Sequence, residues 1–289
     1  MKPLISVIIT TYDRPDKLKR ALPSVLNQTL KDIEIIVVDG KCLKETSKYM
    51  HSIDDDRVIY HGAGGTNVQE ARNLGSRIAN GKYLAYLDDD DEWHEDKLEK
   101  QIKLMDEDTG LVICYSRTNI DTRELVERPK SNITFKDLLK SFNLSHTSSY
   151  LLDKEKLKEI GGFKEFLVGM HEYDIGLELA HRGYKIKTYP EILMEKYNPD
   201  FSTDRRYFGS YYVKVHEIFL FYRFWGKYIL KELSLPEILL VFFKTIGLFG
   251  VLLTGYIIGG RMWDILYELK TWYLEVIRKY EDSNANTIL

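Results

Sequence analysis

Residues 83–93 read Tyr83-Leu-Ala-Tyr-Leu-Asp-Asp-Asp-Asp-Glu-Trp93, an apolar run that ends in four consecutive aspartates. The run is typical of a buried β-strand, and ligands of open α/β sheets bind beyond the carboxyl ends of such strands. Adjacent carboxylates there repel one another unless a divalent cation neutralises them. Magnesium and manganese prefer oxygen ligands and share them with phosphates. The stretch therefore predicts a site for a metal and a diphosphate. The alternative is a solvated acidic loop whose last aspartate caps the next helix.

Further apolar runs, rich in β-branched residues, lie on both sides of this stretch. We expect strands at residues 5–11, 34–39, 58–61, 83–87, 111–116, 148–152 and 185–189. We expect helices at residues 15–27, 68–79, 154–160 and 172–181, the second of them capped by Asn67. We expect irregular loops at residues 119–145 and 198–207. Strands that are apolar on both faces and separated by helices predict an α/β fold with a mostly parallel sheet covered on two sides.

The composition excludes several classes of protein. The chain has 289 residues, of which 44% are hydrophobic and 29% charged, so it is globular rather than disordered. A net charge of -3 argues against nucleic acid as a partner. Only two cysteines occur, Cys42 and Cys114, which indicates a reducing compartment. We expect no secretory signal, because Met1-Lys2-Pro3 runs directly into a strand-like segment.

The last third of the chain has a different character. We expect one domain over residues 1–210 and a helical region over residues 211–289, where aromatic residues are frequent. Residues 245–260 carry no charge, but this stretch is shorter than the roughly 20 residues that a spanning helix needs. Flanking lysines and aromatic residues favour helices that lie in a membrane interface, with the protein peripheral on the cytoplasmic side. The alternative is a helical subdomain that packs on itself or on a second copy in a homodimer.

Two more polar stretches follow predicted elements at the same edge of the sheet. Thr10-Thr-Tyr-Asp-Arg-Pro15 follows the first strand, where a tyrosine can stack on a base and an arginine can meet a phosphate. Asp39 closes the second strand, and Arg72 lies on the helix after the third. Taken alone, the first stretch is equally a strand-to-helix turn. Arg72 alone is equally a surface ion pair.

In this order, the motifs resemble the family 2 glycosyltransferases of the GT-A fold over roughly residues 4–200. The matching stretches are Ser-Val-Ile-Ile-Thr-Thr-Tyr-Asp-Arg-Pro (6–15), Ile-Ile-Val-Val-Asp (35–39), Ala-Arg-Asn-Leu-Gly (71–75), Tyr-Leu-Ala-Tyr-Leu-Asp-Asp-Asp-Asp (83–91) and Ile-Gly-Gly-Phe (160–163). The resemblance implies a nucleotide-sugar-dependent hexosyltransferase. Its donor would be a UDP- or GDP-sugar, and its cofactor Mg²⁺ or Mn²⁺.

The resemblance also implies roles for single residues. The nucleotide base would be held by Thr11, Tyr12, Asp13 and Asp39, and Arg72 would lie near that base, the ribose or the phosphates. The nucleotide sugar would be contacted by Asp88 and Asp89. The metal would be bound by Asp88 and Asp90. Asp88 would lean to ribose or metal, and Asp91 would neighbour the sugar or cap a helix. The family's usual Asp-Asp-Gly-Ser is shortened here to Asp39-Gly40-Lys41. A histidine that often completes the metal site is not evident.

In inverting members, a carboxylate at the start of a helix after the Gly-Gly-Phe loop acts as general base. The corresponding residues here are His171-Glu172-Tyr173-Asp174, so Glu172 is the expected base and Asp174 the second candidate. Acidic residues in a first helical turn also interact favourably with the helix dipole without any chemistry.

Together these observations predict an inverting, metal-dependent transferase that moves one sugar. The Gln-x-x-Arg-Trp motif of processive members is absent, which favours single transfer. We expect the acceptor to be a polyprenyl or dolichyl phosphate or a lipid-linked glycan at the membrane surface, or alternatively a soluble glycan. The remaining alternative is a non-catalytic protein that binds sugar nucleotides or serves as a membrane scaffold.

Overall fold

The computed structural model describes the sheet, the helices that flank it and part of the C-terminal region. The structure describes residues 2–108, 110–120, 123–124, 132–140, 146–167, 171–197, 226, 228–239 and 241. The strands are β1 (Ile5–Thr11), β2 (Ile33–Asp39), β3 (Val58–Gly62), β4 (Tyr83–Asp88), β5 (Asp91–Trp93), β6 (Leu111–Ile120), β7 (Arg123–Glu124), β8 (Asn132–Ile133), β9 (Leu151–Asp153) and β10 (Lys185–Lys196). The helices are α1 (Pro15–Leu26), α2 (Lys44–His51), α3 (Val68–Ile78), α4 (Lys97–Glu107), α5 (Phe135–Lys140), the 3₁₀ turn η1 (Thr147–Ser149), α6 (Lys154–Glu159) and α7 (His171–His181).

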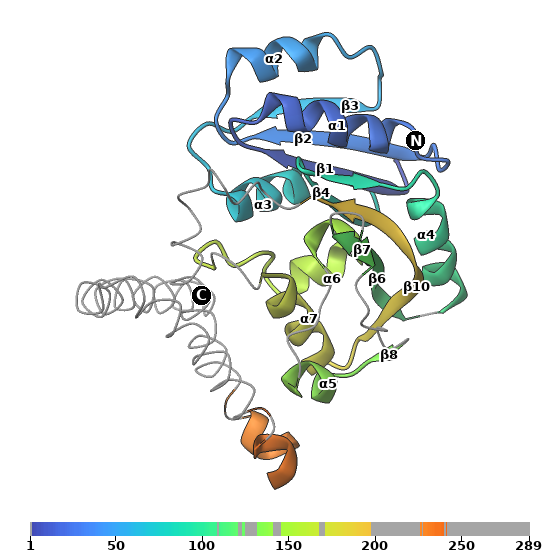
Figure 1. The fold of residues 1–289 in the computed structure, drawn as a ribbon, viewed down its shortest axis with the longest axis vertical. Coiled ribbons are helices and arrows are strands. Elements are labelled where there is room, and N and C mark those ends of the chain that lie inside the picture. The colour runs from blue at the N-terminus through green and yellow to red at the C-terminus, as the bar shows by residue number, and fades with distance from the viewer. Residues whose placement is uncertain are drawn as a thin grey trace, which may run out of the picture. The chain divides into compact units, whose positions relative to one another are not determined.

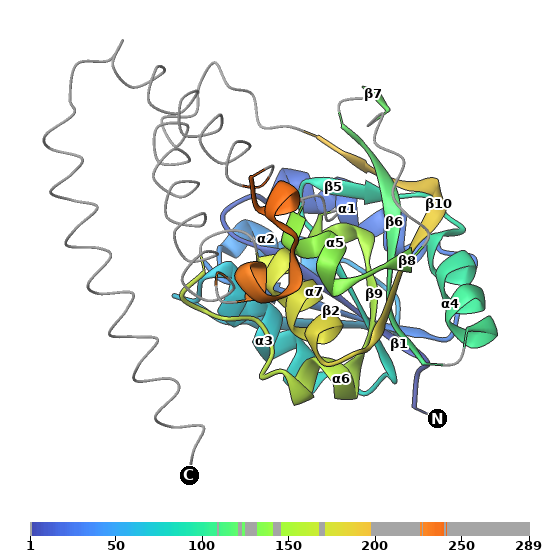
Figure 2. The same cartoon turned by 90° about the horizontal axis from the view of Figure 1, so that it is seen from below.

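The strands form one mixed, mostly parallel sheet in the order β3-β2-β1-β4-β9-β6-β10-β5 (Figures 1 and 2). β1 is parallel to both β2 and β4, and β2 is parallel to β3. β9 runs antiparallel to β4 and β6, and β5 runs antiparallel to β10. The predicted fold class is confirmed, with antiparallel strands inserted where the sequence pattern suggested parallel ones.

Apolar residues on both faces of the central strands explain the layers. Every residue of β1 and β2 is buried. Val7 and Ile9 belong to a core cluster with residues of α1, α2 and α4, which therefore cover one face. Ile8 points to the opposite face, where α3 approaches so closely that a Cβ on Gly75 would lie 2.6 Å from Ile8 Cγ2. The glycine allows this close packing of helix on sheet.

The local signals for α3 are confirmed. Asn67 accepts hydrogen bonds from the backbone nitrogens of Gln69 and Glu70, and the Glu70 carboxylate accepts one from the Asn67 nitrogen. This capping box satisfies amide groups that otherwise lack partners in the first helical turn. It also fixes where α3 begins, one turn before Arg72.

Two expectations need correction. The predicted strand at 148–152 is wrong in its first half, because Thr147–Ser149 form η1 and only Leu151–Asp153 form β9. The predicted loop at 119–145 contains the end of β6 together with β7, β8 and α5. The expected loop at 198–207 and the apolar stretch at 245–260 lie outside the described residues.

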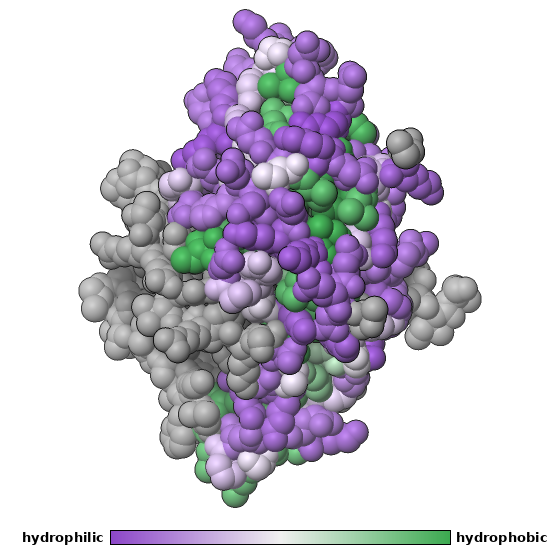
Figure 3. Space-filling view, turned by 90° about the vertical axis from the view of Figure 1, so that its right-hand side faces the viewer, coloured by the Kyte–Doolittle hydropathy of each residue, from purple (hydrophilic) through white to green (hydrophobic). Residues whose placement is uncertain are grey.

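The chain divides into two compact units. The first contains the sheet and comprises Met1–Leu138, Asn143–Glu165 and Glu172–Pro199. The second comprises Leu139–Phe142, Phe166–His171 and Asp200–Leu289. Hydrophilic residues cover most of the described surface in Figure 3, with hydrophobic residues in small separate patches. Within the part of the chain that the structure describes, no helix has the length and apolar character needed to cross a membrane.

Candidate functional site

The carboxyl ends of β1, β2 and β4 meet at one edge of the sheet. The strand register places Thr11 beside Asp39 and Thr10 beside Asp88. The polar residues that close three strands are therefore neighbours in space, as expected for a parallel sheet. Beyond this edge the chain turns at Asp89 and Asp90 and enters β5, which pairs with the end of β10.

The four aspartates alternate between accessible and buried positions. The side chains of Asp88 and Asp90 are 26% and 19% exposed. Asp89 and Asp91 are fully buried. The turn into β5 thus directs every second carboxylate into the protein. Asp88 and Asp90 remain open to a ligand, whereas Asp89 and Asp91 support the turn from inside.

Asp89 is held by the last residue of β1, Thr11, and by Arg14 beyond it. Its carboxylate accepts a hydrogen bond from Thr11 Oγ1 at 2.7 Å and lies 2.7 Å from Arg14 Nη2. Burial raises the pKa of Asp89 to about 6, although Arg14 and Thr11 act in the opposite direction. In this structure the buried carboxylate of Asp89 is bonded to Thr11 and Arg14, and its predicted contact with the nucleotide sugar stays a prediction. We interpret Asp89, and Thr11 with it, as residues that fix the geometry of the site.

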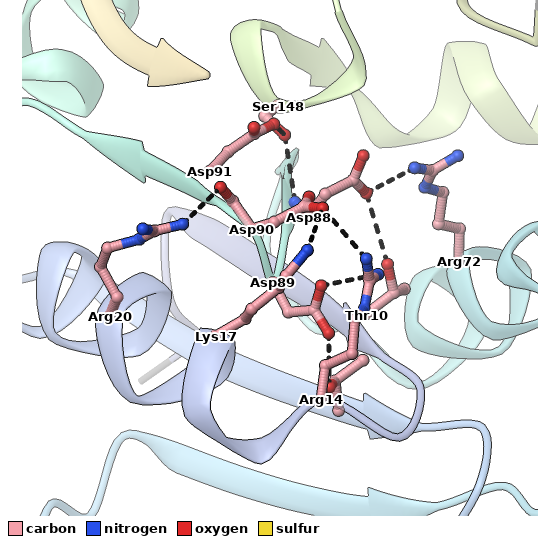
Figure 4. Close-up of polar contacts among 11 residues, drawn as sticks. Thr10, Arg14, Lys17, Arg20, Arg72, Asp88, Asp89, Asp90, Asp91 and Ser148 are labelled. Atoms are coloured by element: carbon pink, nitrogen blue, oxygen red, sulfur yellow. Dashed lines mark hydrogen bonds and ion pairs between the residues drawn. The ribbon is translucent and has the colours of Figure 1, made fainter. Parts of the chain in front are cut away.

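Three basic residues before and on α1 face the aspartate turn. Arg14 Nη1 and Lys17 Nζ lie 3.0 and 3.1 Å from Asp90 Oδ2. Arg20 donates to the backbone oxygen of Asp90 at 2.9 Å. Figure 4 shows Arg20 and Arg72 approaching the aspartates from opposite sides. Lys17 and Arg20 were not among the predicted site residues, although their spacing of three residues places them on one side of a helix.

Arg72 lies between the aspartate turn and Phe163. It is 2% exposed, its Nη2 lies 2.5 Å from Asp88 Oδ1, and its guanidinium lies 5.6 Å from the centre of the Phe163 ring. Burial acts to lower the pKa of Arg72, but nearby charges, including those of Asp88 and Glu172, outweigh it and raise the pKa. Arg72 thus interacts electrostatically with both an aspartate of the turn and the predicted base.

The loop Ile160-Gly-Gly-Phe163 is clamped to α3 next to Arg72. Asn73 Nδ2 donates to the Phe163 oxygen, and the Phe163 nitrogen donates to Asn73 Oδ1, both at 2.8 Å. Gly162 has φ +78°, and a Cβ on it would lie 2.7 Å from Asn73 Oδ1. The glycine is needed both for its backbone conformation and for this close approach. The clamp fixes the Phe163 ring beneath the Arg72 guanidinium.

The two candidate bases at the start of α7 have different surroundings. Glu172 Oε1 accepts hydrogen bonds from Thr147 Oγ1 at 2.7 Å and from the Thr147 nitrogen at 3.3 Å. Asp174 forms an ion pair with Lys164 Nζ at 2.6 Å. Because the charge of Glu172 acts on Arg72, Glu172 belongs to the same electrostatic cluster as Asp88. Asp174 is thus paired with Lys164, a residue of the loop that follows α6.

The residues predicted to hold the nucleotide base differ in exposure and in their hydrogen bonds. Tyr12 is 48% exposed, so its ring is open to stacking. Asp13 is exposed and has φ 59°, a conformation that aspartate tolerates in turns. Asp39 is fully buried, and its carboxylate accepts hydrogen bonds from the nitrogens of Lys41 and Cys42 at 2.9 Å and from Tyr60 Oη at 3.0 Å. Asp39 therefore holds the shortened turn that follows β2.

The donor set fits a divalent metal that is completed by a substrate. Among the described residues, no three histidine, cysteine, aspartate or glutamate side chains form a ready-made metal cluster. Asp88 and Asp90 offer two accessible carboxylates, and Mg²⁺ commonly binds one or two carboxylates together with substrate phosphates and water. Asp91 Oδ1 is buried and lacks a hydrogen-bond partner in the described part of the chain. Burial raises the pKa of Asp91 to about 7, Lys196 opposes this, and Asp88 adds to it. The accessible pair Asp88 and Asp90 therefore fits a metal ion whose remaining ligands come from a substrate.

Comparisons with known proteins give the family and the relatives of this chain. Residues 6–169 match the family model described as "Glycosyl transferase family 2". An uncharacterised glycosyltransferase of Methanocaldococcus jannaschii, MJ1057, is 31% identical over 211 residues, which cover 67% of this chain and 70% of that protein. The Escherichia coli protein WfaP, described as a UDP-Glc:alpha-D-GlcNAc-diphosphoundecaprenol beta-1,3-glucosyltransferase, is 31% identical over 193 residues, which cover 64% of this chain and 73% of that protein.

Solved structures show the same fold. Residues 1–349 of S. aureus TarS align with a TM-score of 0.55 at 17% identity, over 68% of this chain and 60% of that chain. The same fragment in complex with UDP-GlcNAc aligns with a TM-score of 0.58 at 16% identity, over 71% of this chain and 61% of that chain. This chain thus spans somewhat less than two thirds of these TarS fragments.

Proposed function

Because the chain belongs to glycosyltransferase family 2, we propose that it is an inverting, metal-dependent enzyme that transfers one sugar from a nucleotide donor to a membrane-linked acceptor. The observation that carries this proposal is the position of Arg72. It forms an ion pair with Asp88 and also interacts with the charge of Glu172. A donor diphosphate and an acceptor hydroxyl that meet at Arg72 would therefore lie between metal ligands and a base.

Each polar group at this edge has a defined task in such a transfer. Tyr12 stacks on the nucleotide base. Asp88 and Asp90 would hold a Mg²⁺ or Mn²⁺ ion, which would supply charge stabilisation for the departing diphosphate. Arg72 adds a fixed, buried positive charge beside it. The acceptor oxygen forms its bond to the anomeric carbon as the bond from that carbon to the diphosphate breaks, and Glu172 takes the acceptor's proton. Attack opposite the leaving group inverts the anomeric configuration.

The choice of donor and acceptor draws on the relatives. WfaP is described as using UDP-Glc and a diphosphoundecaprenol-linked acceptor, and TarS was crystallised with UDP-GlcNAc. We propose a UDP-sugar in preference to a GDP-sugar, and an acceptor linked to polyprenyl phosphate or diphosphate. Exposed Leu230, Leu235 and Leu239 support contact with a membrane surface. We propose that this surface is the cytoplasmic one. The region 211–289 is proposed as the part that makes this contact, and a homodimer remains the competing use of that region.

A donor panel tests the proposal directly. Purified full-length protein is incubated with UDP-glucose, UDP-N-acetylglucosamine, UDP-galactose or GDP-mannose, with Mg²⁺, Mn²⁺ or EDTA, and with or without a polyprenyl-diphosphate-linked sugar. We expect release of the nucleoside diphosphate with one UDP-sugar, dependent on metal and accelerated by the lipid-linked acceptor. NMR of the product then shows an inverted anomeric centre. Release that persists in EDTA, or a product with retained configuration, contradicts the proposal.

A further inference from the structure

We propose that Thr147 is a positioning residue that holds the carboxylate of Glu172 at a fixed distance from the aspartate turn. This inference rests on the proposed function, because it takes Glu172 as the base. Thr147 donates twice to one oxygen, Glu172 Oε1, through its hydroxyl at 2.7 Å and its backbone nitrogen at 3.3 Å. Two donors from one residue restrict both the position and the rotation of the carboxylate.

The turn that carries Thr147 is itself anchored to the metal side of the site. Ser148 Oγ donates to Asp91 Oδ2 at 2.5 Å and accepts from the Asp88 nitrogen at 3.0 Å. The Ser148 oxygen accepts from Trp93 Nε1 at 2.7 Å. Because these partners belong to β4 and β5, the bonds fasten η1 to both sides of the aspartate turn.

The other end of η1 is also held by hydrogen bonds. Gln101 of α4 donates to the Ser149 oxygen at 2.9 Å, and the Ser149 nitrogen donates to the His146 oxygen at 2.8 Å. Thr147, Ser148 and Ser149 are each at most 1% exposed. The turn is buried and hydrogen-bonded to α4, β4 and β5, which leaves it little freedom to move, although Ser149 Oγ has no hydrogen-bond partner among the described residues. Thr147 therefore links Glu172 to a rigid part of the sheet rather than to a surface loop.

This linkage matters because a glutamate side chain in a first helical turn has several rotamers, and a base must lie within hydrogen-bond reach of the proton that it removes. A displacement of about 1 Å in a catalytic group can cost on the order of 10²-fold in rate. Hydrogen bonds to a carboxylate also favour its charged form. Thr147 is thus expected to act on turnover and on its pH dependence, and to leave donor binding unchanged.

The test compares Thr147→Val, which keeps the shape but removes the hydroxyl, with Thr147→Ser, which keeps the hydroxyl. With the donor that the panel identifies, we expect Thr147→Val to lower kcat about 10- to 100-fold with donor KM within about twofold of wild type. The acidic limb of its pH–rate profile should move to higher pH. Thr147→Ser should recover most of the rate. Thr29→Val is the matched control, because Thr29 Oγ1 also donates to a glutamate, Glu99, at 2.7 Å but on an exposed surface.

Two further measurements separate this inference from the proposed function. In a Glu172→Gln background, adding Thr147→Val should cause no additional loss, because the partner through which it acts is already changed. If Glu172→Gln alone keeps the wild-type rate, the proposed function fails. If Glu172→Gln is inactive while Thr147→Val turns over like wild type, only the inference about Thr147 fails. Crystal structures of wild type and Thr147→Val give a readout without activity, and a Glu172 carboxylate unmoved in the variant overturns the inference.

Discussion

Lys97, at the start of α4, is a buried lysine whose charge is expected to lower the stability of the folded protein. It is fully buried, its Nζ donates to Gln101 Oε1 at 2.6 Å, and it lies 4.0 Å from the centre of the Trp93 ring. Burial lowers its pKa from 10.5 to about 7, against a smaller opposing effect of Cys114. We predict that Lys97→Met stabilises the protein at pH 7, because methionine fills a similar volume without a charge.

The expected gain in stability follows from the pKa of Lys97 in the unfolded and in the folded chain. Between about pH 7 and 10.5 the unfolded chain holds a proton on Lys97 that the folded chain has lost, so wild-type stability rises with pH in this window. The whole rise amounts to about 5 kcal/mol as an upper bound, because each pKa step corresponds to about 1.4 kcal/mol. Lys97→Met leaves Gln101 Oε1 without this donor, which costs about 1–3 kcal/mol. The net gain at pH 7 is therefore at most about 2–4 kcal/mol.

Urea unfolding, followed by tryptophan fluorescence at several pH values from 6 to 10, measures this difference. The gain of Lys97→Met over wild type should shrink as the pH rises, because wild type regains the stability that burial of the charge removes. Lys103→Met, an exposed change on the same helix, should alter stability by less than about 0.5 kcal/mol at every pH. A gain that is absent at pH 7, or that stays constant up to pH 10, would refute the reasoning.

Two other predictions concern the loop and the metal. Gly162→Ala should destabilise the protein by about 2–3 kcal/mol in urea unfolding, because it strains the backbone and displaces Asn73. Gly161 has φ +86°, but a Cβ built on it would have nothing within 4 Å, so Gly161→Ala should cost only about 1–2 kcal/mol. Equal losses of stability in the two variants would contradict the clamp. Arg14→Gln should tighten Mn²⁺ binding roughly threefold to tenfold in calorimetry, because Arg14 competes for Asp90. Lys19→Gln on α1 is the control, and Mn²⁺ affinity that is unchanged or weakened in Arg14→Gln would count against Asp90 as a ligand.

Much of the fold could be predicted because its signals are local. The strands β1 and β2 consist largely of β-branched residues that are buried on both faces, and their predicted bounds agree with the structure to within one residue. The cap at Asn67 is a pattern of four residues and needs no knowledge of the rest of the chain. The order of polar stretches after these strands was enough to predict which residues would gather at one edge of the sheet.

The details of the site depend on contacts that are distant in sequence. The alternating burial of Asp88–Asp91 depends on β5 pairing with β10, about a hundred residues later. Ser148 was predicted to begin a strand, but its side chain bonds to Asp91 and it lies in the 3₁₀ turn η1 beside Thr147, which bonds to Glu172. The sequence gives no indication that Asp39 is occupied by the Lys41 and Cys42 amides.

The central claim, that Glu172 removes the acceptor proton beside a metal-bound donor, is tested most directly by comparing Glu172→Gln with Asp174→Asn. Both are conservative changes in the first turn of α7. The measurement is kcat with the donor from the panel, together with UDP affinity by calorimetry in Mn²⁺. The account predicts that Glu172→Gln loses about two to four orders of magnitude in kcat and binds UDP like wild type, whereas Asp174→Asn stays within about tenfold of wild type. Near-normal turnover in Glu172→Gln, or a larger loss in Asp174→Asn, would contradict it.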